Sequence, residues 1–410
     1  MSARLSAHVG ARVCILGGGG TGIALAWDLA LRGIFVTLVE KGEFTSGTTG
    51  RHHGQLHCGA RYARGDVAIA RECMEESSLL KRLVPQTIEN NGGLFLALDD
   101  EEASGTDEFI AACHAATIPA RELSVADALK LEPAANPHAV RAVWVPDASF
   151  DAYRLPASFL AGARALGARL LNFTRVVGVE IAQGKVRGVR VLHADGREEC
   201  IPCDAAVNAG GVWAAEIGAL AGVHIPVSPA PGALVAIKGR AAQLVLSRLA
   251  PPGDGDILVP QRELNIIGST QRMASGSGPF FPTAEEIIFL RERAAQLVPA
   301  LATAPLHAAW AAARPLSGTA NTLSDGRKAS RNFTVLDHGS EGLRGFFSIT
   351  GGKATVLRAM AEKAADAVCA YMGTDSPCQS ARIKPPSWRA LFAPLEAMRV
   401  EDFNTVGGDV

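Results

Sequence analysis

A glycine-rich turn near the N-terminus reads Val13-Cys14-Ile15-Leu16-Gly17-Gly18-Gly19-Gly20-Thr21-Gly22 and joins two apolar runs, the second ending at Glu40. Its spacing, Gly-x-Gly-x-x-Gly, is typical of the strand–turn–helix unit that binds a dinucleotide. Gly17 permits the tight turn, Gly19 lets a pyrophosphate approach the backbone, and Gly22 lets the helix pack on the strand. The start of that helix attracts phosphate through its partial positive charge. Glu40 lies where a carboxylate can accept hydrogen bonds from ribose hydroxyls.

Two further glycine turns follow predicted strands later in the chain. They are Asn208-Ala209-Gly210-Gly211-Val212-Trp213 and Ser348-Ile349-Thr350-Gly351-Gly352-Lys353. A helix starting after Gly352 would direct its positive end at the edge of a flavin where negative charge develops on reduction. Three such turns suit a long cofactor such as FAD better than a compact NAD site. A plain strand–helix connection is the alternative interpretation of each turn.

The composition sets the limits for the class of protein. A chain of 410 residues can form two domains, or one domain with a large insertion. Its net charge of −1 gives no electrostatic case for binding nucleic acid or an anionic membrane surface. The most apolar long stretch, residues 13–31, contains the glycine turn and Asp28, so no membrane span is predicted. The first residues lack the apolar core of a signal peptide.

The cysteines favour a reducing compartment and no metal site. Eight are scattered along the chain, and only Cys200 and Cys203 have the spacing of metal ligands. A structural zinc site needs about four ligands, and no second pair is present in the sequence. We therefore predict no metal and a cytoplasmic protein with free thiols.

The order of predicted elements indicates an α/β protein. Residues 12–40 read as β-α-β, residues 43–65 as a functional loop, and residues 225–345 as a strand-rich region. Other helices are expected at 66–90, 105–116, 124–131, 156–167, 284–296 and 353–371. Strands at 170–177, 186–193 and 205–208 are expected to return to the nucleotide-binding layer. The expected division is a discontinuous FAD-binding domain (10–100, 145–222 and 340–375), a substrate or cap domain (101–144 and 223–339), and a C-terminal surface tail (376–410).

The loop after the first β-α-β unit carries a family resemblance. The stretch Thr48-Thr49-Gly50-Arg51-His52-His53-Gly54-Gln55-Leu56-His57-Cys58-Gly59-Ala60-Arg61-Tyr62-Ala63 resembles the FAD-dependent glycerol-3-phosphate dehydrogenases, above all their anaerobic-type A (large) subunit. Further matching stretches are Arg71–Cys73, Asn91–Phe95, Val145–Asp147, Asp256–Pro260, Ile267–Thr270, Ala313–Leu316 and Ser330–Arg331. The resemblance covers about residues 12–380. It implies a Rossmann-like, glutathione-reductase-type FAD domain with an interleaved antiparallel-sheet substrate domain, as in the D-amino-acid-oxidase-like superfamily.

The resemblance also implies an activity. The family oxidises sn-glycerol 3-phosphate to dihydroxyacetone phosphate, with hydride passing from C2 to N5 of a non-covalently bound FAD. Electrons would then pass to a quinone or a partner protein. A cytoplasmic protein that docks through a partner at the inner face of the cell membrane would fit this role.

Site residues follow from the same resemblance. His57 and Arg314 would be catalytic. His57 would be the base, because an imidazole can accept a proton near neutral pH. A phosphate dianion needs several cations, and the substrate residues would be Arg61, Tyr62, Thr270, Arg331 and Lys353. The cofactor residues would be Gly17, Gly19, Gly20, Thr21, Gly22, Glu40, Lys41, Thr48, Thr49, Arg51, His53, Gly54, Val176, Ala209, Gly210, Trp213, Arg314, Gly351, Gly352, Lys353 and Ala354. His52 is expected near the flavin as well.

The chain departs from the family pattern at several positions. Pro231 replaces a lysine, Val356 and Leu357 stand where a phenol side chain is expected, and His52 replaces an asparagine. Residues 380–410 hold no counterpart of the cysteine-rich C-terminal domain found in that large subunit. Two alternatives therefore stay open. One is an FAD-dependent oxidase or dehydrogenase of a 2-hydroxy acid or amino acid, because Arg314 and Arg331 could bind a carboxylate as well as a phosphate. The other is a non-catalytic flavoprotein subunit of a complex.

Overall fold

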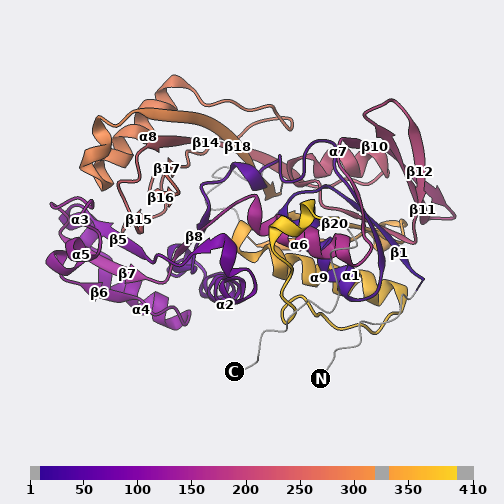
Figure 1. The fold of residues 1–410 in the computed structure, drawn as a ribbon, viewed down its shortest axis with the longest axis horizontal. Helices are drawn as coiled ribbons and strands as arrows, with labels where there is room; N and C mark the ends of the chain where they lie inside the picture. The colour runs from indigo at the N-terminus through magenta and orange to yellow at the C-terminus, as the bar shows by residue number, and fades with distance from the viewer. Residues whose placement is uncertain (1–9, 319–331, 395–410) are drawn as a thin grey trace.

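The computed structural model describes residues 10–318 and 332–394, which form two halves, each built on a large β-sheet (Figure 1). One half carries both ends of the described chain and a mostly parallel sheet. The other half carries a longer, mostly antiparallel sheet. The predicted α/β architecture is confirmed.

The first half centres on a six-stranded sheet whose order is β19-β20-β13-β1-β2-β9. Its strands are β1 (Arg12–Leu16), β2 (Phe35–Val39), β9 (Arg169–Leu171), β13 (Ala205–Asn208), β19 (Phe333–Asp337) and β20 (Phe346–Gly351). All neighbours are parallel except β19, which pairs antiparallel with β20 at the edge. Strands buried on both faces read as nearly continuous apolar runs, and β1 and β13 do so.

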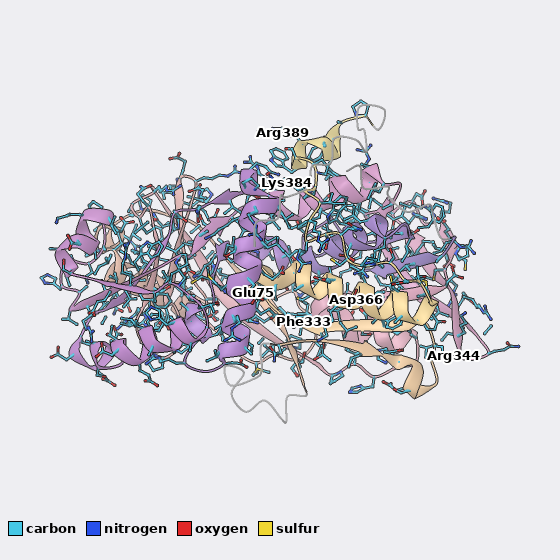
Figure 2. The ribbon with its side chains drawn as sticks, turned by 90° about the horizontal axis from the view of Figure 1, so that it is seen from below. Glu75, Phe333, Arg344, Asp366, Lys384 and Arg389 are labelled. Atoms are coloured by element: carbon cyan, nitrogen blue, oxygen red, sulfur yellow. The ribbon has the colours of Figure 1, made fainter. Side chains whose placement is uncertain are left out.

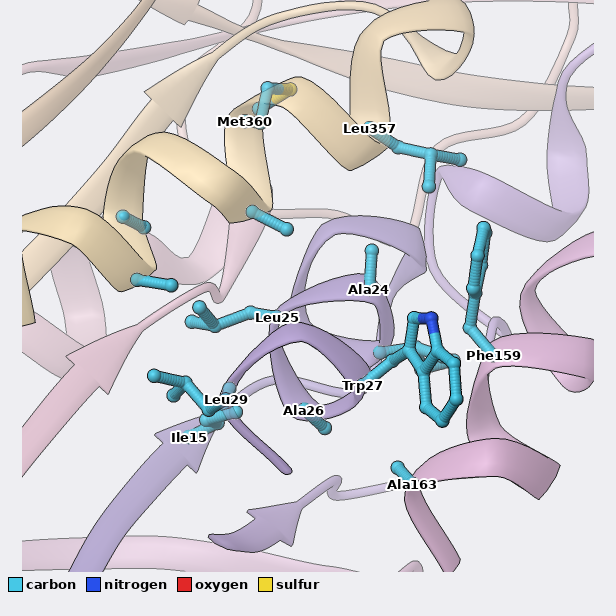
Figure 3. Close-up of a cluster of buried hydrophobic side chains, with 14 of the residues drawn as sticks. Ile15, Ala24, Leu25, Ala26, Trp27, Leu29, Phe159, Ala163, Leu357 and Met360 are labelled. Atoms are coloured by element: carbon cyan, nitrogen blue, oxygen red, sulfur yellow. The ribbon is translucent and has the colours of Figure 1, made fainter. Parts of the chain in front are cut away.

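Helix α1 (Gly20–Leu31) is the centre of the core in this half. Every one of its residues except Thr21 is buried, because the sheet, α6 (Arg154–Ala165) and α9 (Leu357–Met372) surround it (Figure 3). A helix that is apolar all round is expected to be enclosed in this way. Trp27 of α1 lies against Gly162 of α6, where a Cβ atom would lie 2.5 Å from the indole ring. Close packing at this point therefore requires glycine.

The second half is built on an eight-stranded sheet whose order is β18-β14-β17-β16-β15-β5-β7-β6. Its strands are β5 (Gly93–Ala97), β6 (Arg121–Leu123), β7 (Arg141–Val145), β14 (Val227–Lys238), β15 (Val245–Arg248), β16 (Ile257–Gln261), β17 (Leu264–Gly268) and β18 (Leu306–Ser317). Its helices are α3 (Asp100–Ser104), α4 (Thr106–Ala115), α5 (Val125–Leu131) and α8 (Ala284–Leu297). Thr283 and Glu286 form a capping box that fixes the start of α8.

Smaller elements connect and flank the halves. One three-stranded sheet contains β3 (Gln55–Leu56), β4 (Ile88–Glu89) and β8 (Ala148–Phe150), and another contains β10 (Thr174–Ala182), β11 (Lys185–His193) and β12 (Glu198–Pro202). Helix α2 (Val67–Leu83) lies between the halves, and α7 (Ala214–Leu220) follows β13. Charged side chains such as Glu75, Arg344 and Arg389 lie at the surface (Figure 2).

The structure corrects two expectations about these elements. Strands β10 and β11 do not join the nucleotide-binding sheet, because they pair antiparallel with each other and β12. Their alternating polar residues suit a sheet with one solvated face rather than a buried parallel sheet. The helix expected over residues 66–90 ends at Leu83, because Pro85 disfavours helical backbone at the residue before it.

Strand pairing refines the domain boundaries. Strand β5 lies in residues 10–100, which were expected in the FAD-binding domain, but it pairs in the eight-stranded sheet. Strand β19 lies in residues 223–339, which were expected in the substrate domain, but it pairs in the six-stranded sheet. We propose that the two domains follow the sheets at these points. Within the described part of the tail, Ser380 and Ile383 are buried, so this segment is not purely superficial.

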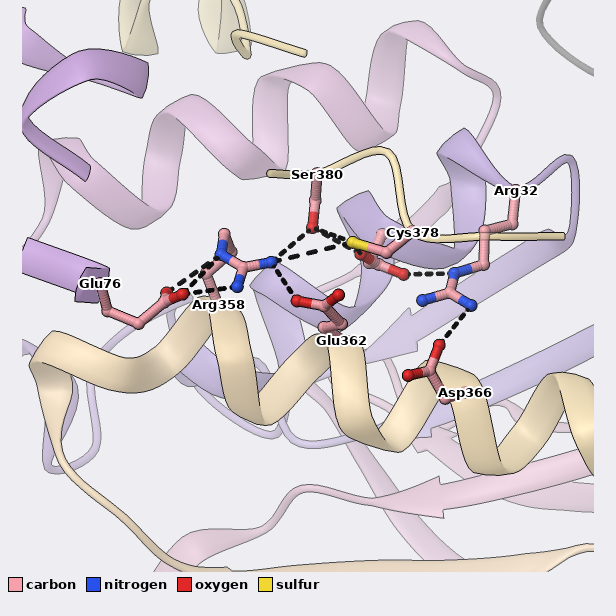
Figure 4. A network of polar contacts seen from close by, with 8 residues as sticks. Arg32, Glu76, Arg358, Glu362, Asp366, Cys378 and Ser380 are labelled. Atoms are coloured by element: carbon pink, nitrogen blue, oxygen red, sulfur yellow. Dashed lines mark hydrogen bonds and ion pairs between the residues drawn. The ribbon is translucent and has the colours of Figure 1, made fainter. Parts of the chain in front are cut away.

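A buried polar network holds α1, α2, α9 and the segment after α9 together (Figure 4). Arg358 of α9 contacts Glu76 of α2, with Nε 3.0 Å from the carboxylate. Arg32 donates to Asp28 at 2.6 Å and to Asp366 at 2.7 Å. Both guanidinium groups are almost completely enclosed. Charges removed from water in this way must be paired, so each partner is necessary for stability.

Glu76→Ala is expected to lower the free energy of unfolding by about 3 kcal/mol, because it leaves the buried Arg358 without its main counter-charge. Urea unfolding of the full chain with FAD bound measures the change. Asp127→Asn is the control, because Asp127 pairs with Lys130 on an exposed helix face and such pairs contribute little. Equal unfolding midpoints for the two variants would contradict the assignment.

Candidate active site

A cavity of about 610 Å³ lies where the two halves meet. The six-stranded sheet contributes the turns after β1, β13 and β20, which are the three glycine turns singled out in the sequence. The eight-stranded sheet contributes Ser269, after β17, and Arg314, on β18. Ligands of α/β proteins bind in the crevice at the carboxyl ends of parallel strands, and this cavity occupies that position.

The structure brings most of the predicted site residues together. The cavity wall includes Gly17, Gly19, Gly20, Thr21, Glu40, Lys41, Thr48, Thr49, Arg51, His53, His57, Arg61, Tyr62, Val176, Ala209, Gly210, Trp213, Arg314, Gly351, Gly352, Lys353 and Ala354. Gly22, Gly54 and Thr270 are not part of the wall. The Thr270 hydroxyl donates to Glu286 and accepts from the Ala233 amide. Arg331 lies outside the described residues.

The turn between β1 and α1 has the geometry of a phosphate-binding turn. A Cβ atom on Gly22 would lie 1.9 Å from the Gly17 carbonyl oxygen, so the helix approaches the strand as closely as glycine allows. Gly19, the residue before the helix, offers no side-chain cap, and the Gly20 amide donates to the Thr49 hydroxyl at 2.9 Å. The glycine backbone at the start of α1 therefore borders the cavity without bulky side chains, as the approach of a pyrophosphate requires.

Glu40 lies in the wall of the cavity, next to the first glycine turn. Its two carboxylate oxygens accept from the Gly18 amide at 2.8 Å and the Gly42 amide at 2.9 Å. These bonds fix the side chain, and each oxygen keeps a second lone pair for a ribose hydroxyl. The ammonium of Lys41 lies 3.7 Å from the centre of the Trp213 ring beside it. This part of the wall suits the adenosine part of a dinucleotide.

Cationic side chains gather at another part of the wall. The Arg61 guanidinium donates to Asp256 at 3.0 Å and to the Gly253 carbonyl at 3.2 Å. Arg314 contacts Ser269 and donates to Gln271 at 3.3 Å. These contacts hold the two guanidinium groups in the cavity wall.

An aromatic pair lies beside a third cation. The Lys353 ammonium lies 5.4 Å from the centre of the Tyr62 ring. The same ring packs edge-on against the His57 imidazole, with 5.2 Å between ring centres. His57, the predicted base, is thus next to residues predicted to bind the substrate.

Two neighbouring histidines in the wall are neutral. The Nδ1 atom of His52 accepts from the Gly54 amide at 2.9 Å, and Nδ1 of His53 accepts from the Gln55 amide at 3.1 Å. Burial lowers the pKa of His52 to about 4. Burial, and then the neighbouring cationic groups, hold the pKa of His53 well below its usual range.

Sequence reasoning missed several residues of the cationic region. Ser269 and Gln271 hold Arg314, and Asp256 holds Arg61. Asp256 and Ser269 belong to stretches that carry the family resemblance, so a signal for them was present. Gln271 had no such signal, because its role depends on the pairing of β14 with β17 and β18.

The wall fits FAD. It joins the start of α1, a fixed carboxylate and two further glycine turns in one cavity, which is what a dinucleotide with a second ring system needs. Among residues 10–318 and 332–394, no cluster of three or more potential metal ligands occurs. The fold and this cavity define a flavin-dependent oxidoreductase.

Comparison with known proteins gives the family. Residues 12–358 match the family model described as FAD dependent oxidoreductase, and the chain belongs to that family. It is 39% identical over 378 residues to the A subunit of anaerobic glycerol-3-phosphate dehydrogenase from Escherichia coli K12, covering 91% of this chain and 70% of that protein. The A1 subunit of the enzyme of the same name from Haloferax volcanii is 38% identical over 381 residues, which cover 90% of this chain and 65% of that protein.

Solved structures show the same fold. L-proline dehydrogenase from P. horikoshii superposes with a TM-score of 0.73 at 23% identity, covering 89% of this chain and 94% of that one. Glycerol-3-phosphate dehydrogenase from Bacillus halodurans, complexed with FAD, gives a TM-score of 0.71 at 23% identity, covering 92% of this chain and 67% of that one. The predicted superfamily fold and FAD as cofactor are therefore confirmed. In the described part of the chain, none of the helices has both the length and the hydropathy needed to cross a bilayer.

Glu40→Ala is expected to reduce the retention of FAD, because it removes a carboxylate that the Gly18 and Gly42 amides hold at the ribose end. The ratio of flavin to protein after gel filtration, and the affinity of the apoprotein for FAD, measure the effect. Glu43→Ala is the control, because Glu43 contacts Asn172 outside the wall. A fully flavinated Glu40→Ala protein would remove Glu40 from the cofactor site.

His52→Asn is expected to flatten the pH dependence of stability between about pH 4 and 6.5. The unfolded chain binds a proton at His52 below the ordinary histidine pKa near 6.5, whereas the folded chain does so only near 4. The unfolded state therefore holds more protons in this window, and His52 makes stability fall as the pH falls. Urea unfolding at several pH values checks this, with the exposed His138 replaced by Asn as control. Parallel curves for wild type and His52→Asn would contradict it.

Proposed function

We propose that this protein oxidises sn-glycerol 3-phosphate, or a closely related polyol phosphate, to dihydroxyacetone phosphate with FAD as cofactor. The observation that carries this proposal is the group of Arg61, Arg314 and Lys353 in the wall of one cavity that also fits a dinucleotide. A phosphate dianion is bound best by several cations, and guanidinium groups match its oxygens with paired donors. The relatives named glycerol-3-phosphate dehydrogenase support the choice of substrate.

The reaction assigns separate tasks to these residues. FAD supplies the acceptor for the hydride that leaves C2 of the substrate, so two electrons pass to the flavin and C2 becomes a carbonyl carbon. The hydroxyl proton must go to a base, and His57 is the proposed group. Arg314 is proposed to act near the reacting carbon, Arg61 and Lys353 to hold the phosphate, and Tyr62 to pack beside them. Thr270 is proposed to act indirectly, through the Ala233 backbone, and Arg331 keeps its proposed phosphate role.

The reduced flavin needs an electron acceptor. The names of the curated relatives call each of them one subunit, the A or A1 chain, which identifies those proteins as parts of a larger assembly. We propose that this chain likewise passes electrons to a partner protein or a quinone. A cytoplasmic location with docking at the inner face of the cell membrane would serve such a transfer.

Anaerobic mixing of the full, FAD-loaded chain with sn-glycerol 3-phosphate tests the proposal directly. We expect rapid bleaching of the flavin band near roughly 450 nm, a wavelength set by the cofactor. Glycerol is the matched control, because it has the same carbon chain without the phosphate that Arg61 and Lys353 would bind. A 2-hydroxy acid and an amino acid complete the panel.

The panel separates the alternatives. Faster reduction by the 2-hydroxy acid or amino acid would replace the proposed substrate while keeping the enzyme class. Equal reduction by glycerol and glycerol 3-phosphate would remove the proposed phosphate role of Arg61 and Lys353. A flavin that none of these compounds bleaches would favour a non-catalytic flavoprotein subunit.

A further inference from the structure

We infer that His53 donates its Nε2 proton to the oxygen of the substrate at which charge develops, and that it is not the base. This inference rests on the proposed function, and it moves His53 from the predicted cofactor residues to the substrate. Three features support it: the way the loop is fixed, the ring nitrogen that carries the proton, and the groups that surround the ring.

The loop that carries His53 is held by side chains from the other half of the molecule. The indole N–H of Trp310, on β18, donates to the Arg51 carbonyl at 2.7 Å. The amide of Gln261, at the end of β16, donates to the Phe150 carbonyl at 3.0 Å and lies 3.3 Å from the Gly54 carbonyl oxygen. These hydrogen bonds hold the loop against the eight-stranded sheet, next to the cavity.

Gly54 allows the loop to approach the Gln261 side chain closely. Its φ of +81° is unfavourable for other residues, and a Cβ atom there would lie 2.0 Å from the Gln261 side-chain nitrogen. The loop therefore has little freedom to move away from β16. A fixed loop is what a hydrogen-bond donor needs if it is to act without reorganisation during the reaction.

The hydrogen bonds of the ring determine its tautomer. Because Nδ1 of His53 accepts the Gln55 N–H, the ring proton of the neutral form is on Nε2. Within the described residues, Nε2 of His53 makes no hydrogen bond, and the side chain is part of the cavity wall. The ring therefore offers the cavity a donor and no acceptor, so it cannot take a proton from the substrate at Nε2.

The groups near His53 include residues that the proposed function assigns to the substrate. His52, Arg314, His57 and Arg61 are its charged or titratable neighbours, and all of them disfavour a positive charge on the ring. A neutral imidazole beside cations that attract an anionic substrate is suited to donate to an oxygen that gains negative charge as its proton leaves. His57 would accept that proton as the base, and His53 would donate a hydrogen bond to the oxygen.

The test compares two replacements at His53 in the full, FAD-loaded chain. His53→Phe keeps a ring without a donor, and His53→Gln restores an N–H at a similar distance from the backbone. His307→Phe, at an exposed position of β18, is the matched control. Flavin reduction by sn-glycerol 3-phosphate is followed without oxygen. Binding of dihydroxyacetone phosphate to the oxidised enzyme is followed by the change in flavin absorbance.

We expect His53→Phe to slow flavin reduction about 100-fold, the typical effect of losing one donor to a developing oxyanion. Product binding should weaken severalfold, and FAD content should stay unchanged. His53→Gln should recover most of the rate with the pH profile of the wild type. Wild-type rate and product affinity in His53→Phe would overturn the inference, as would loss of FAD with unchanged product affinity, which would return His53 to the cofactor.

A second measurement does not depend on turnover. In protein labelled with ¹⁵N-histidine, the His53 signals, assigned by their loss in His53→Gln, should show the Nε2–H tautomer unchanged from pH 5 to 8. An Nδ1–H tautomer, or titration near pH 6.5, would overturn the inference. Wild-type protein that glycerol 3-phosphate does not reduce would instead refute the proposed function.

Discussion

The contact between Gly22 and Gly17 is the constraint on which the rest of the structure depends. Because the start of α1 lies directly against the end of β1, the helix axis points at the cavity and its first turn forms part of the wall. The remainder of α1 is then buried among the sheet, α6 and α9, which must supply apolar surface on all sides. Asp28 near its far end and Arg32 just after it are also enclosed, and they form hydrogen bonds with each other and with the segment after α9.

The cavity that results has two chemically distinct regions. The region around Glu40 is built from backbone amides and a carboxylate, all from the six-stranded half. The cationic region takes Arg61 and Lys353 from the first half or its loops and Arg314 from β18. The region around Glu40 is therefore formed by residues of one half alone. The cationic region is formed only when the two halves are packed together.

This difference explains how much could be predicted from the sequence. The β1–α1–β2 unit, its glycines and Glu40 were predictable because they depend on contacts within about 30 residues, where spacing alone determines geometry. The family resemblance brought in His57, Arg61, Arg314 and Lys353, which lie far apart in the chain. Gln261 escaped notice because its partner, Gly54, lies about 200 residues away. Asp256 stood in a stretch that carries the resemblance, but its pairing with Arg61, also about 200 residues away, was not visible in the sequence. The separate β10–β11–β12 sheet was missed because a strand pattern does not identify its neighbours.

The hydrogen bonds from Gln261 and Trp310 to residues 51–54 have a consequence for how the two halves fold. One wall of the site is a loop from the first half held by side chains of the second, so neither half alone carries a complete site. Folding of the two halves and filling of the cavity are then thermodynamically linked, and a ligand that bridges them stabilises both at once. A ligand that contacts both halves would then hold the two sheets together.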